Sequence, residues 1–483
     1  MPRSEPYERL GARRLRLPDL IAQSVGFMGP AFSAAFMVPL IAGVISASGQ
    51  GGGVAAPLSV IIAAVGALAV GRVVAAYAAA VPAAGSLYDY VSRGLGARIG
   101  TAAGWLYYSG ATVLLAGLLL LAGGYLQGTV QADFGVRPLP AWAWTLLLMA
   151  AVAAAAYLGA RISARTQLAL ALVSLLVVGA FLVVVIVRRG PVSTLRPFSP
   201  AAAGSGWAGI FFGALYGIVL FAGFETAANL AEETPRPRRH VPAAVMTAAG
   251  IGAGFFLLAT YAEVTGFHDR LSALTAAAGA PLFALGAPAR SGGYGGPWTD
   301  RLLELVVLLD MIAMAVGCAA AASRGWFAMA RDRRVPAALA IVSRRHRTPV
   351  AALALVFAFC GAALLVSQLW TGLLAMPPAA HYLALFAWGA TFGGFALVVA
   401  YLLTCLGALR SFGAAPRRVP VVIAALAGLA ITAGAVYASF DEVTKPLIYA
   451  PCVALAVLAI GFASTFVLAA RPPASARLAG PAP

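Results

Sequence analysis

The chain contains almost no lysine and few charges of either sign. Among its 33 basic residues only Lys445 is a lysine, and charged residues occupy 10% of the 483 positions. Hydrophobic residues occupy 61%, and the mean hydropathy is +0.90. Because a soluble domain carries about 25% charged residues, this composition excludes a soluble globular protein and predicts a chain that crosses a membrane several times.

Cysteine and histidine are also scarce, and neither forms a pattern that would hold a metal. The four cysteines fall inside apolar stretches without the spacing of a metal or redox site, so we expect small core residues. They are Cys318, Cys360, Cys405 and Cys452. The four histidines lie in expected loops or at helix ends. We therefore expect no metal, no cofactor and no intramembrane enzyme, which would need a nucleophile, a base or a metal inside the spans.

A membrane-spanning helix needs about 20 mostly apolar residues. Twelve such stretches occur, at 20–45, 55–81, 97–127, 139–158, 163–188, 207–232, 241–266, 300–330, 349–370, 382–409, 420–440 and 447–470. The predicted fold class is therefore an all-α integral membrane protein with 12 transmembrane helices. Residues 1–19 and 471–483 are expected to be cytoplasmic tails.

The basic residues are distributed unevenly between the two sets of loops. With both termini cytoplasmic, the inner loops hold 23 of them and the outer loops hold eight. Positive residues concentrate in the cytoplasmic loops of membrane proteins, so this bias predicts cytoplasmic termini in a plasma membrane. It also accounts for the net charge of +17 without a nucleic-acid partner.

The first expected span is interrupted at Gly29-Pro30. Pro30 has no N–H and forces the preceding residue out of the helical conformation. A second half that begins near Ala31 would present the unpaired N–H groups of Ala31, Phe32 and Ser33 at its positive end, which suits a carboxylate. A packing kink is the alternative explanation of Gly29-Pro30 taken alone.

The sixth expected span carries a carboxylate near its middle. Glu225 follows a segment that four glycines weaken, the last of them Gly223. Because a charge at the bilayer centre costs roughly 2.5 kcal/mol or more, this span is expected to open toward a polar cavity. Carbonyls exposed near Phe221, Ala222 and Gly223 would suit an ammonium group, so the two breaks together describe a site for the main chain of an amino acid.

Interrupted spans five helices apart are typical of an inverted five-plus-five repeat. Similarity between residues 20–188 and 207–409 is not clear residue by residue, so spacing alone predicts the repeat. The two halves form an expected transport core at 20–410, and the last two helices, within 411–470, lie outside it.

Three groups of motifs resemble those of amino acid–polyamine–organocation (APC) permeases, and they occur in the family's order between about residues 20 and 410. The first runs from Gly223-Phe224-Glu225 to Glu232-Glu233-Thr234, Pro237 and Val241-Pro242. The second is Pro82-Ala83-Ala84-Gly85-Ser86-Leu87-Tyr88 with Leu95-Gly96 and Gly104-Trp105. The third is Ser323-Arg324 with Ala328-Met329-Ala330-Arg331-Asp332, Pro336 and Arg347-Thr348-Pro349.

The resemblance implies a LeuT-like fold in which helices one, three, six, eight and ten enclose a site near the bilayer midplane and alternate its access. Gly29-Pro30-Ala31 would occupy the place of the family's Gly-Ser-Gly turn, although its last two residues depart from that pattern. Ser33 could then supply a hydroxyl one turn later.

The absence of lysine from every span also bears on ion coupling. In several proton-coupled relatives a lysine on helix five fills the place of a sodium ion, and counting along the chain puts that position at Ser174. Ser174, with Ser323 or Cys318 of helix eight nearby, is a candidate site for a water or a sodium ion, although a lone serine often bonds to its own helix. Glu225 resembles a family glutamate that responds to pH, with a structural hydrogen bond to helix one as the alternative, and Asp310 is the second candidate for a proton or cation.

The aromatic candidates for walls or gates of the site, with ordinary helix packing as the alternative, are Tyr107, Tyr108, Phe221 and Trp388. Of the two tyrosines, Tyr108 is the one expected to bind substrate. All these features predict a secondary active transporter, or permease, of amino acids or related organic amines, acting as a monomer or homodimer in the lipid bilayer. Proton-coupled symport is the first interpretation. An amino acid or polyamine exchanger and a sodium-coupled symporter are the alternatives, and a non-transporting receptor is a further one.

Overall fold

The computed structural model describes residue 10 and residues 15–45, 50–190, 195–277, 279–369, 378–412, 418–441, 443 and 445–467. Over these residues the protein is helical and contains no β-sheet. The α-helices are α1 (Leu17–Met28), α2 (Pro30–Ile41), α3 (Ala56–Ala80), α4 (Ser86–Leu95), α5 (Ala97–Phe134), α6 (Ala141–Tyr157), α7 (Ala160–Arg189), α8 (Gly206–Gly217), α9 (Pro237–Gly266), α10 (Leu271–Ala276), α11 (Pro281–Gly286), α12 (Thr299–Arg331), α13 (Val350–Leu369), α14 (Pro378–Phe412), α15 (Val419–Ala438) and α16 (Tyr449–Val467).

Eleven helical stretches in the described ranges are long and apolar enough to cross a membrane. The expected span at 139–158 is the exception, because it forms α6, an apolar helix of 17 residues. That length is at the lower limit for a spanning helix, so the predicted number of twelve rests on α6. The tail expected at 471–483 lies outside the described residues, and α1 begins at Leu17, inside the tail expected at 1–19.

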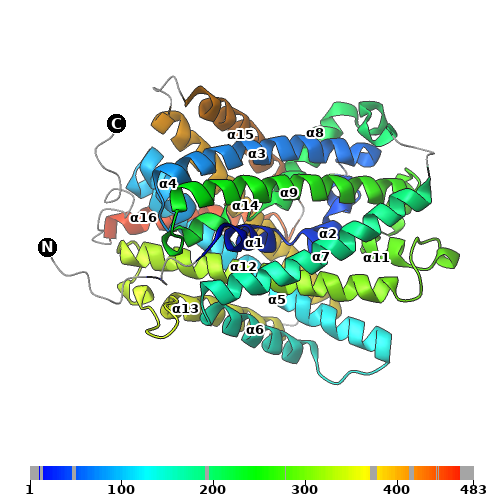
Figure 1. Ribbon diagram of the computed structural model, residues 1–483, viewed down its shortest axis with the longest axis horizontal. Coiled ribbons are helices and arrows are strands. Elements are labelled where there is room, and N and C mark those ends of the chain that lie inside the picture. The colour runs from blue at the N-terminus through cyan, green and yellow to red at the C-terminus, as the bar shows by residue number, and fades with distance from the viewer. Residues whose placement is uncertain are drawn as a thin grey trace.

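The helix α5 is 38 residues long and packs against α14, α12, α16 and α6. In Figure 1, α6 and α13 lie together at the lower edge of the bundle, while α15 lies at the upper edge against α3 and α14. Helices at matching positions of the two expected repeats are in contact, namely α3 with α9, α5 with α12, and α6 with α13. The inverted repeat itself stays a prediction.

The first span is broken at Gly29, between α1 and α2, as the sequence predicts. Gly29 has φ 54° and ψ 61°, a left-handed conformation that glycine adopts without steric cost. Pro30 follows as the first residue of α2, where its missing N–H loses no hydrogen bond. A Cβ at Gly29 would also lie 3.0 Å from the Sδ of Met314. The break divides the span into two helices of 12 residues each.

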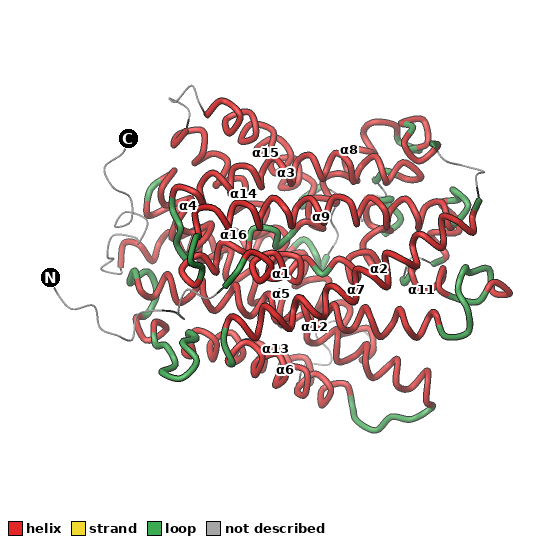
Figure 2. The backbone as a smooth tube through the Cα atoms, viewed as in Figure 1, coloured by secondary structure: helices red, strands yellow, loops and turns green. Residues whose placement is uncertain are grey.

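The sixth span is broken as well, close to Glu225. Figure 2 shows loop segments in green inside the helical bundle, where the broken spans lie. The span consists of α8, a 3₁₀ helix at Ile218–Phe221, a turn segment at 222–225 and a second 3₁₀ helix at Thr226–Glu233.

Gly223 is required at this second break by both conformation and space. Its φ is 107°, and a side chain there would overlap the ring of Phe27. Ser24 of α1 then joins the two broken spans, because its hydroxyl donates to the carbonyl of Phe224 at 2.7 Å and accepts from the N–H of Ala227 at 3.0 Å. The two breaks are therefore held side by side.

Candidate functional site

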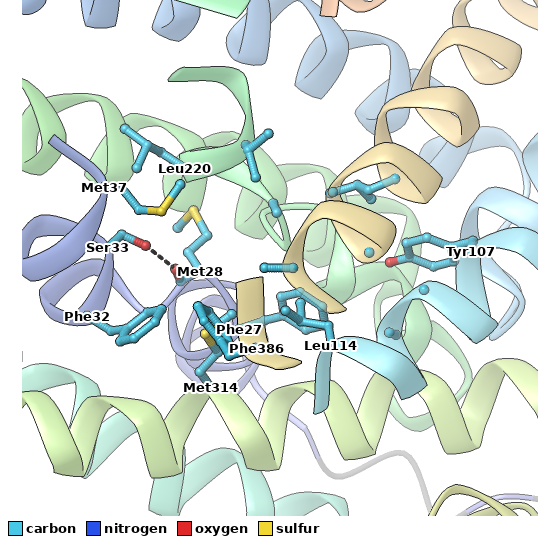
Figure 3. A pocket seen from close by; sticks show the side chains of 18 residues that line it. Phe27, Met28, Phe32, Ser33, Met37, Tyr107, Leu114, Leu220, Met314 and Phe386 are labelled. Atoms are coloured by element: carbon cyan, nitrogen blue, oxygen red, sulfur yellow. Dashed lines mark hydrogen bonds between the residues drawn. The ribbon is translucent and has the colours of Figure 1, made fainter. Parts of the chain in front are cut away.

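A cavity lies where the two broken spans meet α5, α12 and α14 (Figure 3). Its empty volume is about 650 Å³, which includes the open space at its mouth. It is bordered by spans one, three, six, eight and ten, the five that were expected to enclose the site. The lining residues are Phe27, Met28, Phe32, Ser33 and Met37 of span one; Val219, Leu220 and Ala222 of span six; Tyr107, Gly110, Ala111 and Leu114 of α5; Met314 of α12; and Phe386, Ala390, Gly393, Gly394 and Leu397 of α14.

Three of the nine residues predicted to bind substrate line this cavity, namely Phe32, Ser33 and Ala222. Tyr108 does not line the cavity. Its hydroxyl donates instead to the backbone carbonyl of Gly85, at 2.5 Å. Successive residues of a helix point about 100° apart, so only one of two neighbouring tyrosines can face the cavity. That residue is Tyr107, which approaches from the side opposite Met37 and Leu220 in Figure 3.

The other predicted residues shape the two breaks behind the lining. They are Gly29, Pro30, Ala31, Phe221 and Gly223. The carbonyls of Phe221 and Gly223, which were expected to be free, accept turn hydrogen bonds from the N–H groups of the residues three positions later, at 3.2 Å and 3.0 Å. Of the three predicted carbonyl groups, only that of Ala222 belongs to a lining residue.

The N-terminus of α2 is not open, and this part of the prediction was wrong. The N–H of Ser33 donates to the carbonyl of Gly29 at 2.8 Å, and the N–H of Phe32 donates to the Asp310 carboxylate at 2.9 Å. Asp310 comes from α12, is fully buried, and also interacts with the amide of Ala31. An acid of another span thus fills the place expected for the carboxylate of a substrate.

Glu225 lies behind the cavity wall and is held by two tyrosines. Its Oε1 accepts a hydrogen bond from the hydroxyl of Tyr107 at 2.6 Å. Its Oε2 accepts from the hydroxyl of Tyr401 and from the N–H of Gly223, the latter at 3.2 Å. The tyrosine bonds join span six to spans three and ten. The alternative role expected for Glu225, a structural hydrogen bond, was placed on helix one instead. Since Tyr107 lines the cavity, one hydrogen bond separates the fully buried Glu225 from it.

The two serines predicted to flank a water or a sodium ion are not close together. The hydroxyl of Ser174 donates to the carbonyls of Leu170 at 2.8 Å and Val306 at 3.2 Å, and that of Ser323 donates to the carbonyl of Ala320 at 3.3 Å. In α12, Val306 lies 17 positions from Ser323 and 12 from the alternative partner Cys318, which is about 25 Å and about 18 Å along a helix. The expectation of one shared site was therefore wrong.

Gln167 of α7 is joined to helix one directly and to α12 through Gln23. Its Nε2 donates to the Oε1 of Gln23 at 3.0 Å, and the Nε2 of Gln23 donates to the carbonyl of Gly317 at 3.1 Å. Both glutamines are buried. The sequence contained a signal for this pair, since each glutamine interrupts an apolar stretch, but no periodicity indicates that the two meet.

A second polar cluster lies where α4 meets the ends of span six and α12. Arg331 donates two hydrogen bonds to Glu232, at 2.7 Å and 2.8 Å, and Arg324 pairs with Glu233 at 2.7 Å. Asp89 of α4 is buried beside them. Burial, assisted by neighbouring carboxylates and opposed by Arg331, raises the pKa of Asp89 to about 8.

Two interrupted spans beside one buried cavity define a membrane transporter. The chain belongs to the amino acid permease family, which matches residues 27–464. The branched-chain amino acid permease BcaP of Bacillus subtilis (strain 168) is 24% identical over 342 residues, or 64% of this chain and 68% of the relative. The low-affinity putrescine importer PlaP of Escherichia coli (strain K12) is 27% identical over 210 residues, or 40% and 42% of the two chains.

The fold is shared with a solved transporter. A manganese transporter of Eremococcus coleocola matches with a TM-score of 0.53 at 11% identity, over 96% of this chain and 98% of that one. The resemblance seen in the sequence motifs is thereby confirmed at the level of the family, and the protein is a transporter and not an enzyme.

Proposed function

We propose that this protein is a secondary active transporter that carries amino acids or related organic amines across the plasma membrane by alternating access, driven by protons. The observation that carries this proposal is the meeting of two helix breaks at one buried cavity. The breaks bring the first turn of α2, where Asp310 is bound, and the residue Ala222 to the cavity wall. A helix N-terminus suits a carboxylate and a backbone carbonyl suits an ammonium group, so a substrate carboxylate would share this helix end with Asp310.

The polar cluster supports a conformation that is closed at the proposed cytoplasmic end. The pairs of Arg331 with Glu232 and of Arg324 with Glu233 join the end of span six to the end of α12. The N–H of Leu15 also donates to the carbonyl of Glu233, at 3.2 Å. In the proposed orientation these contacts lie between the cavity and the cytoplasm, so they must separate before a substrate can leave toward the cytoplasm.

Asp310 is the first proposed coupling group. A substrate carboxylate that approaches α2 would meet the carboxylate of Asp310 at the same helix end, and two such groups repel each other unless one is protonated. No charged side chain of the described residues acts on Asp310 to offset this repulsion. Binding of substrate would therefore favour uptake of one proton by Asp310, and release of both at the other side would complete the cycle.

Glu225 is the second proposed coupling group. It reaches the cavity through the hydroxyl of Tyr107. A proton on Glu225 would therefore change the hydrogen bonding of the Tyr107 hydroxyl, which is a donor at the substrate cavity.

Sodium coupling is supported less well. Hard cations bind oxygen ligands, and between spans one, five and eight the Oε1 of Gln167 is buried without a hydrogen-bond partner, but two neighbouring oxygen atoms are already engaged. The Oε1 of Gln23 and the carbonyl of Gly317 each accept a hydrogen bond from an amide group. A cation there would have to displace both bonds.

Uptake into proteoliposomes tests the proposal. The purified protein is reconstituted, and uptake of labelled amino acids is measured with an acidic exterior, with equal pH on both sides, and with an imposed sodium gradient. Accumulation that follows the pH gradient supports the proposal. Uptake that occurs only when the vesicles contain unlabelled substrate would instead identify an exchanger. The absence of flux of any amino acid or amine under any gradient would contradict transport.

A further inference from the structure

We infer that the cavity selects substrates with one bulky apolar side chain, as in large aliphatic or aromatic amino acids, and rejects diamines and basic amino acids. This inference rests on the proposed transport function and names the substrate class of the same site.

The walls of the cavity carry no charge. None of its 18 lining residues is acidic or basic, four are aromatic, and three are methionines. Burying apolar surface is favourable by about 25 cal/mol per Å², and methionine side chains adapt to the shape of an apolar partner. A charged side chain would instead lose its hydration without gaining a partner.

Aromatic rings and closely packed small residues form two parts of the cavity wall. Phe32 and Phe386 meet edge to face, with ring centroids 5.4 Å apart and planes at 87°, a preferred geometry for aromatic pairs. Gly110, Ala111 and Gly393 lie on the α5 and α14 side of the lining. The two glycines allow α5 and α14 to pack closely, because a Cβ at Gly110 would lie 2.8 Å from the Cβ of Ala396 and one at Gly393 would lie 3.1 Å from the carbonyl oxygen of Gly110.

The two polar side chains of the lining are already engaged. The hydroxyl of Ser33 donates to the carbonyl of Met28 at 3.1 Å (Figure 3), and that of Tyr107 donates to Glu225. Glu225 itself is fully buried behind Tyr107 and does not line the cavity. Asp310 does not line the cavity either, and one of its oxygens is bound to the N–H of Phe32. A second ammonium group would thus be buried without a carboxylate in the cavity wall, which is unfavourable.

The test is a comparison of solutes in proteoliposomes that contain the full-length protein. Uptake of labelled leucine is measured alone and with equal concentrations of unlabelled isoleucine, phenylalanine, alanine, arginine or putrescine. We expect the large apolar amino acids to compete at least about tenfold better than alanine, as expected for several buried methylene groups, and arginine and putrescine not to compete. Direct uptake of labelled arginine or putrescine at a rate equal to leucine would overturn the inference while leaving transport intact. Uptake of none of these solutes would overturn the proposed function, and the inference with it.

A matched pair of variants tests whether the absence of charged residues from the cavity wall causes the selectivity. Met314→Glu and Met314→Gln place side chains of nearly equal size at the wall, and only the first adds a carboxylate. The measured quantity is the ratio of arginine or putrescine uptake to leucine uptake. We expect this ratio to be about tenfold higher in Met314→Glu than in Met314→Gln, since a buried ion pair replaces an unpaired charge. Equal ratios in the two variants, when both melt as single folded species, would contradict the inference.

Discussion

Asp310 and Phe32 are 278 positions apart in the chain, yet a hydrogen bond of 2.9 Å joins the carboxylate of the first to the N–H of the second. This bond lies in the first turn of α2, at the positive end of the helix, where a carboxylate is stabilised. A transporter that needs this helix end for the carboxylate of its substrate must either move Asp310 or neutralise it. Neutralisation requires only a proton, which gives the fold a simple route to proton coupling.

The first prediction concerns Asp310→Asn. The asparagine keeps an oxygen for the N–H of Phe32 but cannot gain or lose a proton at physiological pH. We expect accumulation of leucine driven by a pH gradient to fall by at least about tenfold, which is about 1.4 kcal/mol in the coupled step, while exchange against internal leucine falls much less. Asp300→Asn, at the start of the same helix, is the control. Unchanged accumulation in Asp310→Asn would remove this residue from coupling.

The second prediction concerns the carboxylate held by two tyrosines. Glu225→Gln leaves an amide group opposite two hydroxyl donors, so one of them loses its acceptor, at a cost of about 1–3 kcal/mol. We expect slower uptake and an altered pH profile of the uptake rate. Tyr401→Phe removes one donor and keeps the titratable group, so uptake should stay pH-dependent but with a shifted profile, since the hydroxyl stabilises the charged carboxylate. An identical rate and profile in Glu225→Gln would exclude a coupling role.

The sequence predicts the spans and both breaks because these depend on local chemistry. A run of apolar residues specifies a spanning helix wherever it occurs, and Gly29 and Gly223 stand where the backbone needs positive φ. The contacts that complete the site are different in kind. The Tyr401 to Glu225 bond spans 176 positions, and no periodicity indicates which side chains of two distant helices will meet. For the same reason the sequence offered both Tyr107 and Tyr108 as wall residues and favoured Tyr108 for substrate binding, whereas Tyr107 is the one that lines the cavity.

The third prediction concerns the pH dependence of stability, through Asp89 on α4. Burial raises the pKa of this group from its usual 3.8 to about 8, so between these values the folded protein binds a proton more tightly than the unfolded chain does. Its contribution to stability is therefore fully present below about pH 4 and is lost as the pH rises through about 8. We expect the melting temperature in detergent to fall between pH 5 and pH 8.5, and the fall to be smaller in Asp89→Asn. Equal slopes for the two proteins would contradict this assignment.

The fourth prediction compares a buried and an exposed ion pair. Arg324 and Glu233 are 2% and 5% exposed, whereas Arg301 and Asp133 are 42% and 18% exposed. Arg324→Met leaves an unpaired buried carboxylate and should lower the free energy of unfolding by about 3 kcal/mol or more, while Arg301→Met should lower it by less than about 1 kcal/mol. Adding Glu233→Gln to Arg324→Met should recover part of the loss. Denaturant unfolding in detergent measures all three, and equal losses in the two single variants would refute the comparison.

The fifth prediction concerns the glycine at the break of span six. Gly223→Ala combines an unfavourable φ of 107° with an overlap against the ring of Phe27. Positive φ in a residue with a side chain costs about 1–3 kcal/mol, and the overlap adds to this or pushes Phe27 into the cavity that it lines. We expect a lower melting temperature and strongly reduced uptake. Adding Phe27→Ala should relieve the overlap alone, so stability should recover only in part.

Gly250→Ala on α9 is the control, because a Cβ there meets no neighbour within 4 Å and alanine favours the helix. If Gly223→Ala melts and transports like Gly250→Ala, the break does not require glycine, and the geometry proposed for the substrate site would have to be abandoned.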